Sequence, residues 1–276
     1  MAKHISNEIK NIIISNYPTK GLIWCAETTG LTQKTVRGIK SRLKLKLTKE
    51  HKKEIVEQRR IADALAADIN IKTPEQAYLF GFLWGDGHLK CSNGSFYPYL
   101  GIVEKDFSII SYIFEGWNIT NRSRSKNRQR ICEAIKFDRE MGLFLLKNDY
   151  LQKSYVSPTK ILHHISVDLL NYFWRGFSDA DGCFYINEKN HIYQYILSGS
   201  YKQDWTDVEN ICKQLNIVYT VTQITNNGKH KQYHSSRVRI VGKNNVKKMG
   251  DFLYAGKMFG LQRKYEKYKT IKDKCE

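Results

Sequence analysis

The sequence of 276 residues lacks any apolar run that approaches the roughly 18–20 residues needed to span a bilayer. Residues 1–17 contain a short apolar patch, but they also carry Asn7, Glu8 and Asn11 and lack a small-residue cleavage site. This segment therefore indicates an amphipathic helix rather than a signal peptide, and no membrane partner is expected.

Paired cysteine motifs are also missing, because the six cysteines are scattered along the chain without a CxxC pair. This spacing argues against a zinc site. Without a secretory signal the cysteines are expected to be free thiols, so an intracellular reducing compartment is expected, either the cytoplasm or an organelle. An intact intein begins with Cys or Ser and ends with a His-Asn pair, and this sequence shows neither feature. A free-standing or intron-encoded protein is therefore expected.

Acidic residues are too few to balance the basic ones. The chain has 27 Asp and Glu residues and 45 Lys and Arg residues, which gives a formal net charge of +18. An excess of this size favours a polyanionic partner, most often nucleic acid. A merely solvated surface is the alternative, and the placement of the charges along the chain decides between the two.

The second half of the chain repeats the first. Three pairs of segments match in the same order: LFGFLWGDG (79–87) with WRGFSDADG (174–182), residues 106–119 with residues 204–217, and YLQKSY (150–155) with GLQRKY (260–265). Ordered matches of this kind, separated only by small insertions, indicate a tandem duplication.

Each repeat is expected to follow the same αββαββα plan. A helix that ends in an acid–Gly pair is followed by two strands rich in Tyr and Ile. A second helix, with Asp106 or Asp204 as its N-cap, then precedes another strand pair and a final helix. The predicted fold class is α+β, with tandem αββαββα repeats at residues 71–165 and 166–276.

Residues 1–70 lie outside the repeats and are expected to form a small all-α domain with a helical linker. An apolar helix is followed by a break at Gly30, an N-cap at Thr32 and a second, basic helix. This pattern is typical of a helix-turn-helix, whose second helix would place Lys34 and Arg37 on DNA. An ordinary helical hairpin is the alternative interpretation.

Small residues recur four positions apart in both motifs: Gly81 with Gly85, and Gly176 with Ala180. Residues at this spacing share a helix face, and their small size lets two helices approach backbone to backbone. The two motif helices are therefore expected to pack about a pseudo-two-fold axis. Asp86 and Asp181 would then emerge together at helix C-termini, where the helix dipole repels a carboxylate.

Two carboxylates can converge on two helix C-termini if a cation lies between them. Oxygen ligands from carboxylates and water suit Mg²⁺ or Mn²⁺. Paired carboxylates that share divalent metals beside a basic surface are typical of metal-assisted phosphodiester hydrolysis, so Asp86 and Asp181 are the expected metal ligands. A turn or a calcium loop is the alternative, but the EF-hand spacing is absent.

The two motifs resemble those of single-chain LAGLIDADG homing endonucleases, with a helix-turn-helix-like extension before them. The last acidic position of the family motif falls on Asp86 and Asp181. Its sixth position, where the family tolerates variation, is Trp84 in the first copy and Asp179 in the second. The resemblance implies an asymmetric monomer that cleaves both strands of a long double-stranded DNA target with divalent metals and leaves staggered 3′ overhangs.

The resemblance also implies roles for residues near the acids. The residue before each acid, Gly85 or Ala180, would lend a backbone carbonyl to the metal. A basic residue after the final helix of each repeat would polarise the site. The LQK and LQRK matches place this residue at Lys153 and Lys264, with Arg263 as a substitute for the latter.

Basic residues occupy every second position of NRSRSKNRQR (121–130), which in a strand would put them all on one face. Such a row suits a β-ribbon in a major groove, where Arg pairs with guanine edges, although a turn near residues 125–127 would move some members onto phosphate. An exposed charged hairpin is the alternative. The expected DNA-binding residues of the two strand pairs are Arg122, Arg124, Lys126, Arg128, Arg130, Lys229, Lys231, Arg237 and Arg239.

Three functions remain in competition. The first is a metal-dependent, site-specific DNA endonuclease. The second is a splicing maturase that binds intron RNA, and the third is a non-catalytic DNA-binding regulator. The acids at both motifs disfavour the regulator, because a pure binder has no use for their electrostatic cost, but they do not exclude the maturase.

Overall fold

The chain divides into two compact units, unit 1 (residues 1–66) and unit 2 (residues 67–276). A computed structural model describes residues 5–66, 68–92, 94–123, 130–227 and 232–275. Both predicted repeats lie within unit 2.

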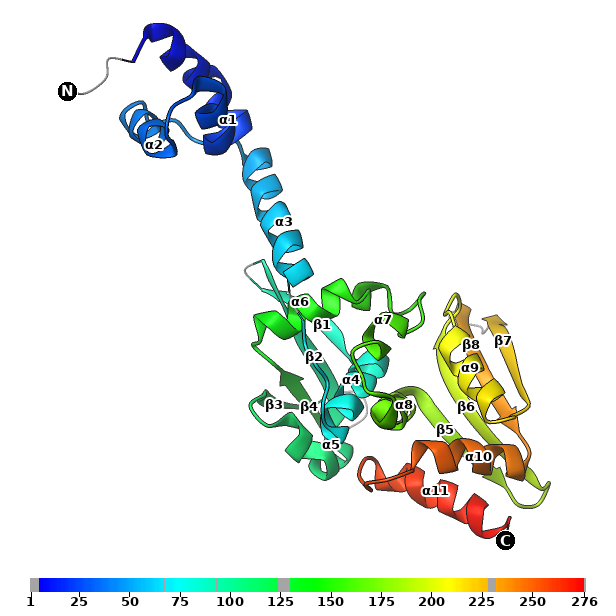
Figure 1. Ribbon diagram of the computed structural model, residues 1–276. Helices are drawn as coiled ribbons and strands as arrows, with labels where there is room; N and C mark the ends of the chain where they lie inside the picture. Colours follow the sequence, from blue (N-terminus) through cyan, green and yellow to red (C-terminus); the bar gives the residue numbers. More distant parts are fainter. Residues whose placement is uncertain (1–4, 67, 93, 124–129, 228–231, 276) are drawn as a thin grey trace. The chain divides into compact units, whose positions relative to one another are not determined.

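Unit 1 is helical, as its sequence predicts. Its described residues form α1 (Asn7–Thr29), α2 (Gln33–Arg42) and α3 (Lys49–Ala66) (Figure 1). α1 is interrupted at Gly21, whose φ of 78° lies outside the helical range, and it ends at Gly30 in the left-handed conformation. The predicted N-cap at Thr32 is confirmed, since its hydroxyl accepts the N–H of Thr35 at 3.2 Å. The buried core of unit 1 consists of Ile13, Tyr17, Cys25, Ala26, Val36 and Ile39.

Unit 2 contains two αββαββα repeats, and this confirms the predicted α+β class. The first repeat comprises α4 (Pro74–Asp86), β1 (His88–Ser92), β2 (Ser95–Val103), α5 (Glu104–Ile110), β3 (Asn118–Ser123), β4 (Arg130–Ile135) and α6 (Arg139–Lys147). The short α7 (Thr159–Leu162) follows it. The second repeat comprises α8 (Leu170–Asp181), β5 (Gly182–Asn187), β6 (Ile192–Ser200), α9 (Thr206–Gln214), β7 (Tyr219–Asn227), β8 (Gln232–Val241) and α10 (Lys243–Leu253). A further helix, α11 (Gln262–Asp273), follows the second repeat.

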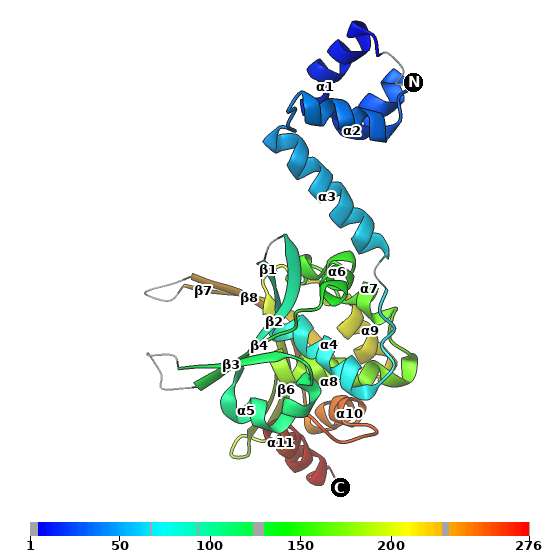
Figure 2. The same cartoon turned by 90° about the vertical axis from the view of Figure 1, so that its left-hand side faces the viewer.

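Each repeat forms one four-stranded antiparallel sheet, with strand order β1-β2-β4-β3 or β5-β6-β8-β7. Side chains alternate between two faces of each sheet. The face that carries the paired residues Leu100 and Ala134, or Tyr195 and Ile240, is buried beneath helices. The opposite faces are called the open faces below. Strands β3–β4 and β7–β8 extend on the same side of unit 2 (Figure 2).

The motif helices α4 and α8 pack against each other as predicted. A Cβ atom at Gly81 would lie 1.8 Å from the carbonyl oxygen of Phe173, and one at Gly176 would lie 2.0 Å from that of Tyr78. Real Cβ atoms do not approach a backbone oxygen so closely, so both positions require glycine. Large apolar side chains are buried around this contact: Phe82, Leu83, Trp84, Phe173, Trp174 and Phe177.

Replacement of Gly81 or Gly176 by Ala is therefore expected to destabilise unit 2 by about 3 kcal/mol or more, because the new methyl group would overlap a carbonyl of the facing helix. Urea unfolding followed by circular dichroism measures the loss. Gly38→Ala on α2 is the control, since a Cβ there has nothing within 4 Å, and it is expected to be neutral or slightly stabilising. Wild-type stability in Gly81→Ala would contradict the close packing of α4 and α8.

The predicted N-cap role of Asp106 is wrong. α5 begins at Glu104, so Asp106 lies inside its first turn. Its carboxylate instead accepts three hydrogen bonds from the guanidinium of Arg263 on α11, at 3.0, 3.3 and 2.8 Å. Asp204 does accept the N–H of Thr206, the first residue of α9, at 2.9 Å, although it lies one position before the helix cap. Local spacing alone does not distinguish a cap from an acid that pairs with a distant arginine.

Candidate active site

The acids that end α4 and α8 come together in unit 2. Asp86 is the last residue of α4, and Asp181 is the last residue of α8. A Cβ atom at Gly85 would lie 2.3 Å from the Cβ of Ala180 and 3.1 Å from Oδ2 of Asp181. Two helix C-termini, each with a partial negative charge, therefore meet beside a pair of carboxylates.

Two lysines cap these helix ends. The carbonyl acceptors lie 2.5–3.3 Å from the lysine Nζ atoms: Leu83, Trp84 and Gly85 for Lys153, and Ser178, Asp179 and Gly182 for Lys264. The ammonium groups satisfy terminal carbonyls and oppose the helix dipole. From the sequence, a metal alone is expected to offset the unfavourable helix dipole at the two acids. In the structure the two lysines supply a substantial part of this compensation.

Lys264, rather than Arg263, occupies the position equivalent to Lys153. The guanidinium of Arg263 pairs with Asp106 at 2.8 Å and makes none of its hydrogen bonds with the carbonyls at the end of α8. The lysine thus follows the shared Leu-Gln pair one residue later in the second repeat than in the first. It lies at the start of α11, where the helix directs it toward the site.

Both acids are harder to ionise than free carboxyls. The pKa of Asp181 is raised to about 6, chiefly by burial and then by the charge of Asp86, against the opposing charges of Lys153 and Lys264. Burial also raises the pKa of Asp86, while the same lysines lower it. Carboxylates that disfavour each other in this way are stabilised by a proton or a cation between them.

The pKa values of the two lysines are lowered, whereas those of the acids are raised. Burial lowers the pKa of Lys153 to about 8, although the charges of Asp181 and Asp86 raise it. Burial likewise lowers the pKa of Lys264. The four groups form a coupled cluster. Asp86 helps to keep both lysines protonated, Asp181 helps to keep Lys153 protonated, and each lysine helps to keep both acids ionised.

The donor set fits a divalent cation that takes its remaining ligands from water and substrate. Among the described residues, no group of three or more His, Cys, Asp or Glu side chains forms a metal site by itself. The two carboxylates supply hard oxygen ligands, and the carbonyl oxygens of Gly85 and Ala180 lie one residue before them. The Gly85 oxygen accepts a hydrogen bond from Lys153 and keeps a second lone pair.

A pocket of about 470 Å³ lies beside Asp86, over the open face of the first sheet. Its lining residues are Asp86, His88, Tyr99, Gly101, Arg122, Ile131 and Glu133. The rings of His88 and Tyr99 lie 4.4 Å apart between centroids. Burial, followed by the charge of Lys153, lowers the pKa of His88, so its imidazole is neutral near pH 7. The pocket connects the acid to the sheet face that the sequence predicts to bind DNA.

Arg122 and Arg130 lie on opposite faces of the first sheet, so the expected single row of basic side chains is wrong at its two ends. Arg122 is opposite Ile131 in the register, which places Arg130 on the other face. Arg122 shares the open face with Glu133 and pairs with it at 3.1 Å. Arg130 instead comes within 3.8 Å of Glu104.

The remaining predicted DNA-binding residues fall into three groups. Arg237 and Arg239 lie two residues apart on the open face of the second sheet, where Arg239 Nε donates to Gln194 at 3.1 Å. Lys34 and Arg37 are exposed on α2, whose buried side carries Val36 and Ile39. Five predicted residues lie outside the described ranges: Arg124, Lys126, Arg128, Lys229 and Lys231.

Sequence reasoning missed several buried polar residues that lie close to the capping lysines. Tyr150 donates its hydroxyl to the carbonyl of Leu83 at 2.6 Å. The fully buried carboxylate of Asp179 accepts the hydroxyl of Tyr78 at 2.8 Å, and Arg175 is also fully buried. The differences between the two otherwise matching repeats were the available signal for Tyr150 and Asp179.

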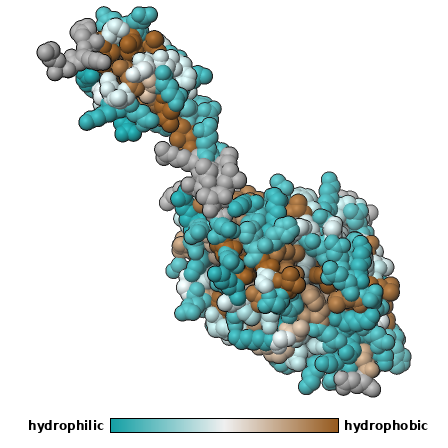
Figure 3. All heavy atoms as spheres, viewed as in Figure 1, coloured by the Kyte–Doolittle hydropathy of each residue, from teal (hydrophilic) through white to brown (hydrophobic). Residues whose placement is uncertain are grey.

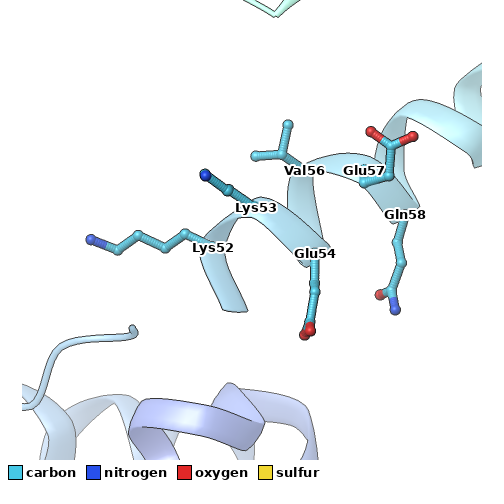
Figure 4. A pocket seen from close by; sticks show the side chains of 6 residues that line it. All are labelled: Lys52, Lys53, Glu54, Val56, Glu57 and Gln58. Atoms are coloured by element: carbon cyan, nitrogen blue, oxygen red, sulfur yellow. The ribbon is translucent and has the colours of Figure 1, made fainter. Parts of the chain in front are cut away.

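Two other surface features of the described residues carry no comparable set of acids and lysines. The hollow in Figure 4 is lined by residues of α3 alone, with charges of both signs: Lys52, Lys53, Glu54, Val56, Glu57 and Gln58. In Figure 3 the hydrophobic residues gather on unit 1 and in several groups across the visible face of unit 2, with hydrophilic residues between them. Within the described ranges, each helix is too short or too polar to cross a membrane. All six cysteines are described, and all are unpaired thiols.

The paired motif helices, the duplicated sheets and the converging acids are the features on which the resemblance to LAGLIDADG proteins depends. Residues 168–251 match the family model of the LAGLIDADG-like domain, so the second repeat carries such a domain and the resemblance seen in the sequence is confirmed. No curated protein matches the chain.

The chain is similar to several solved structures. One is the homing endonuclease I-WcaI bound to its DNA recognition sequence, at 13% identity and a TM-score of 0.47, with coverage of 74% of this chain and 91% of that one. A second is the LAGLIDADG meganuclease I-AabMI bound to uncleaved DNA, at 12% identity and a TM-score of 0.44, with coverage of 73% and 90%. A third is the N-terminal LAGLIDADG domain of DUF199/WhiA, at 10% identity and a TM-score of 0.42, with coverage of 71% and 91%.

Proposed function

We propose that this protein is a site-specific endonuclease that hydrolyses both strands of double-stranded DNA with a divalent metal held between Asp86 and Asp181. The observation that carries the proposal is the convergence of two acids and two capping lysines at the ends of paired helices. Such a cluster is electrostatically costly in isolation, as the raised pKa values of the acids indicate. A cation and a phosphate group would relieve that cost.

Each half of the site supplies one acid and one lysine. Both acids would hold the cation together, and each lysine would act on one DNA strand. Bound Mg²⁺ or Mn²⁺ would supply an activated water and stabilise the leaving oxygen. Asp86 and Asp181 would hold the cation, with the carbonyls of the preceding residues as further ligands. Lys153 and Lys264 would stabilise the negative charge that develops on the phosphate.

The open faces of the two sheets are the proposed DNA-binding surface. Arg122, Arg237 and Arg239 lie on them, and the net charge of +18 favours a polyanion. We propose that unit 1 adds contacts through Lys34 and Arg37 of α2, which are exposed. A monomer suffices for this function, because one chain carries both halves of the site.

Replacement of Arg237 and Arg239 together by Gln is expected to weaken specific DNA binding by about 10-fold or more, because each lost contact to a base or phosphate carries roughly 1–3 kcal/mol. Fluorescence anisotropy at several salt concentrations measures this effect. Lys269→Gln is the control, since this exposed lysine is on α11, which packs on the helix-covered side of β5. Equal weakening by Lys269→Gln would contradict the assignment of the open face.

Selection of cleaved molecules from a randomised duplex pool, together with the DNA that flanks the coding locus, tests the proposed function. In Mg²⁺, the wild-type protein is expected to cut both strands at one sequence and leave staggered ends. Specific binding without cutting in Mg²⁺ or Mn²⁺ would overturn the nuclease and favour a regulator. Binding confined to intron RNA would instead favour a splicing maturase.

A further inference from the structure

The two repeats differ at a pair of positions that meet in space. In the aligned motifs Trp84 corresponds to Asp179, and in the aligned segments YLQKSY and GLQRKY, Tyr150 corresponds to Gly260. In each repeat the first residue lies near the end of the motif helix, and the second lies just before the capping lysine. The two differences therefore belong to the same contact.

In the first repeat this contact is aromatic. The rings of Trp84 and Tyr150 meet edge to face, with centroids 5.9 Å apart. Tyr150 is 1% exposed, and its hydroxyl also donates to Leu83. The backbone N–H of Lys153 donates to the carbonyl of Tyr150 at 3.2 Å, so the aromatic pair holds the turn that carries this lysine.

In the second repeat a buried carboxylate replaces the aromatic pair. Oδ2 of Asp179 accepts the backbone N–H of Leu261 and the hydroxyl of Tyr78, both at 2.8 Å. A Cβ atom at Gly260 would lie 2.6 Å from the same Oδ2, and the φ of Gly260 is 109°. Glycine therefore allows the chain to reach the carboxylate. The backbone N–H of Lys264 donates to the carbonyl of Leu261 at 2.9 Å, as that of Lys153 does to Tyr150.

Arg175 holds the chain that leads to this contact. Its fully buried guanidinium donates to the carbonyls of Leu253, Ala255 and Lys257 at 2.6, 2.8 and 2.8 Å. These carbonyls lie at the last residue of α10 and in the segment that leads to α11, so this segment is fixed before it reaches Asp179. A buried carboxylate that fixes one backbone N–H at the start of α11 thus sets the position of that helix.

We propose, on the basis of the proposed function, that Asp179 is a positioning residue that seats Lys264 through Leu261 and thereby controls cleavage of one DNA strand. Trp84 and Tyr150 seat Lys153 and control cleavage of the other strand. The two halves of the site thus reach similar lysine geometry by different interactions, and each half is sensitive to a different substitution.

Strand-resolved kinetics on a duplex with a different label on each strand test this proposal. Asp179→Leu is expected to slow one strand by about 10-fold or more, because small misplacement of a group at the reacting centre has effects of this size. The affected strand should be the one that Lys264→Met slows. Tyr150→Leu should slow the opposite strand, which is the one that Lys153→Met slows. Asp179→Asn keeps an oxygen acceptor and is expected to restore most of the rate.

Equal slowing of both strands by Asp179→Leu, in protein with a wild-type circular dichroism spectrum, would overturn the proposal. If Asp179→Leu does not fold, Gly260→Ala takes its place, because the added methyl group would displace the chain from Asp179. Its effect should again fall on the strand that Lys264→Met slows, and equal slowing of the strands would again overturn the proposal.

A second readout needs no cleavage. Trace acetylation of lysines followed by mass spectrometry is expected to show Lys264 protected in the wild type and reactive in Asp179→Leu, or in Gly260→Ala where the first does not fold. Lys153 should keep its wild-type reactivity in both. Unchanged protection of Lys264 would overturn the positioning role. If the wild type cuts no DNA, the proposed function fails, and the labelling still decides whether Asp179 seats Lys264.

Discussion

Asp181→Asn is expected to make the metal-free protein more stable at pH 7.5 and at the same time to abolish double-strand cleavage. The pKa of Asp181 is raised from its usual 3.8 to about 6, first by burial and then by Asp86. A difference of this size corresponds to at most roughly 3 kcal/mol of destabilisation once the carboxyl is ionised. The amide removes that charge, and we expect a gain of about 1–3 kcal/mol in the free energy of unfolding.

The pH dependence of this gain has a definite sign. Because the folded-state pKa is raised, Asp181 does not penalise folding below pH 4, and the penalty grows until the pH has passed about 6. The advantage of Asp181→Asn over the wild type should therefore be largest at pH 7.5 and vanish near pH 4, in urea unfolding with EDTA. Asp273→Asn, at an exposed position on α11, is the control. Equal stability of Asp181→Asn and the wild type at pH 7.5 would contradict the destabilisation of the ionised Asp181 by burial and by Asp86.

Mg²⁺ should reverse this order of stability. A cation that binds the folded site stabilises the wild type by mass action, whereas Asp181→Asn has lost a ligand and should respond weakly. Cleavage of either strand by the variant should fall by about 1,000-fold or more, since the metal stabilises both attacking and leaving oxygens. The more stable protein is thus expected to be the inactive one.

Lys264→Met is expected to lower both stability and activity. The ammonium donates to three carbonyl oxygens at the end of α8, and its side chain is buried, with 6% exposure. Loss of the donors leaves these carbonyls unsatisfied, at a cost of about 1–3 kcal/mol for each buried group. Removal of a buried charge compensates in part, so we expect a net loss of about 2–4 kcal/mol. Cleavage of one strand should fall by about 100-fold.

Lys153→Met should have the smaller structural effect, because Lys153 is half-buried rather than buried. Urea unfolding and strand-resolved cleavage measure both variants, and Lys269→Met at an exposed position on α11 is the matched control. Wild-type stability and cleavage in Lys264→Met would show that the helix end does not need its cap. An effect of equal size in Lys269→Met would mean that general charge loss is responsible.

The features that the sequence predicts correctly have local causes. The small residues four apart in each motif require close helix packing, and this packing brings Asp86 and Asp181 together. The cap at Thr32 and the αββαββα plan likewise follow from short-range patterns. The internal duplication strengthens the prediction of the αββαββα plan, because the same pattern occurs twice in the sequence.

The features that the sequence does not predict depend on contacts between distant segments. The hydrogen bond between Asp179 and Leu261 joins residues that are 82 positions apart in the sequence. The ion pair between Asp106 and Arg263 joins residues that are 157 positions apart. The faces of Arg122 and Arg130 depend on the register of β3 and β4, which the alternation of basic residues does not fix. Such contacts depend on tertiary packing, for which a single sequence carries no direct signal.

Strand-by-strand cleavage of the selected DNA target, in Mg²⁺ and in EDTA, tests the paired-acid site most directly. The wild-type protein should cut both strands in Mg²⁺ and neither strand in EDTA. The double variant Asp86→Asn/Asp181→Asn should bind the same DNA and cut neither strand. Cutting by the double variant at the wild-type rate, or cutting by the wild type in EDTA, would contradict a metal-dependent site built on these two aspartates.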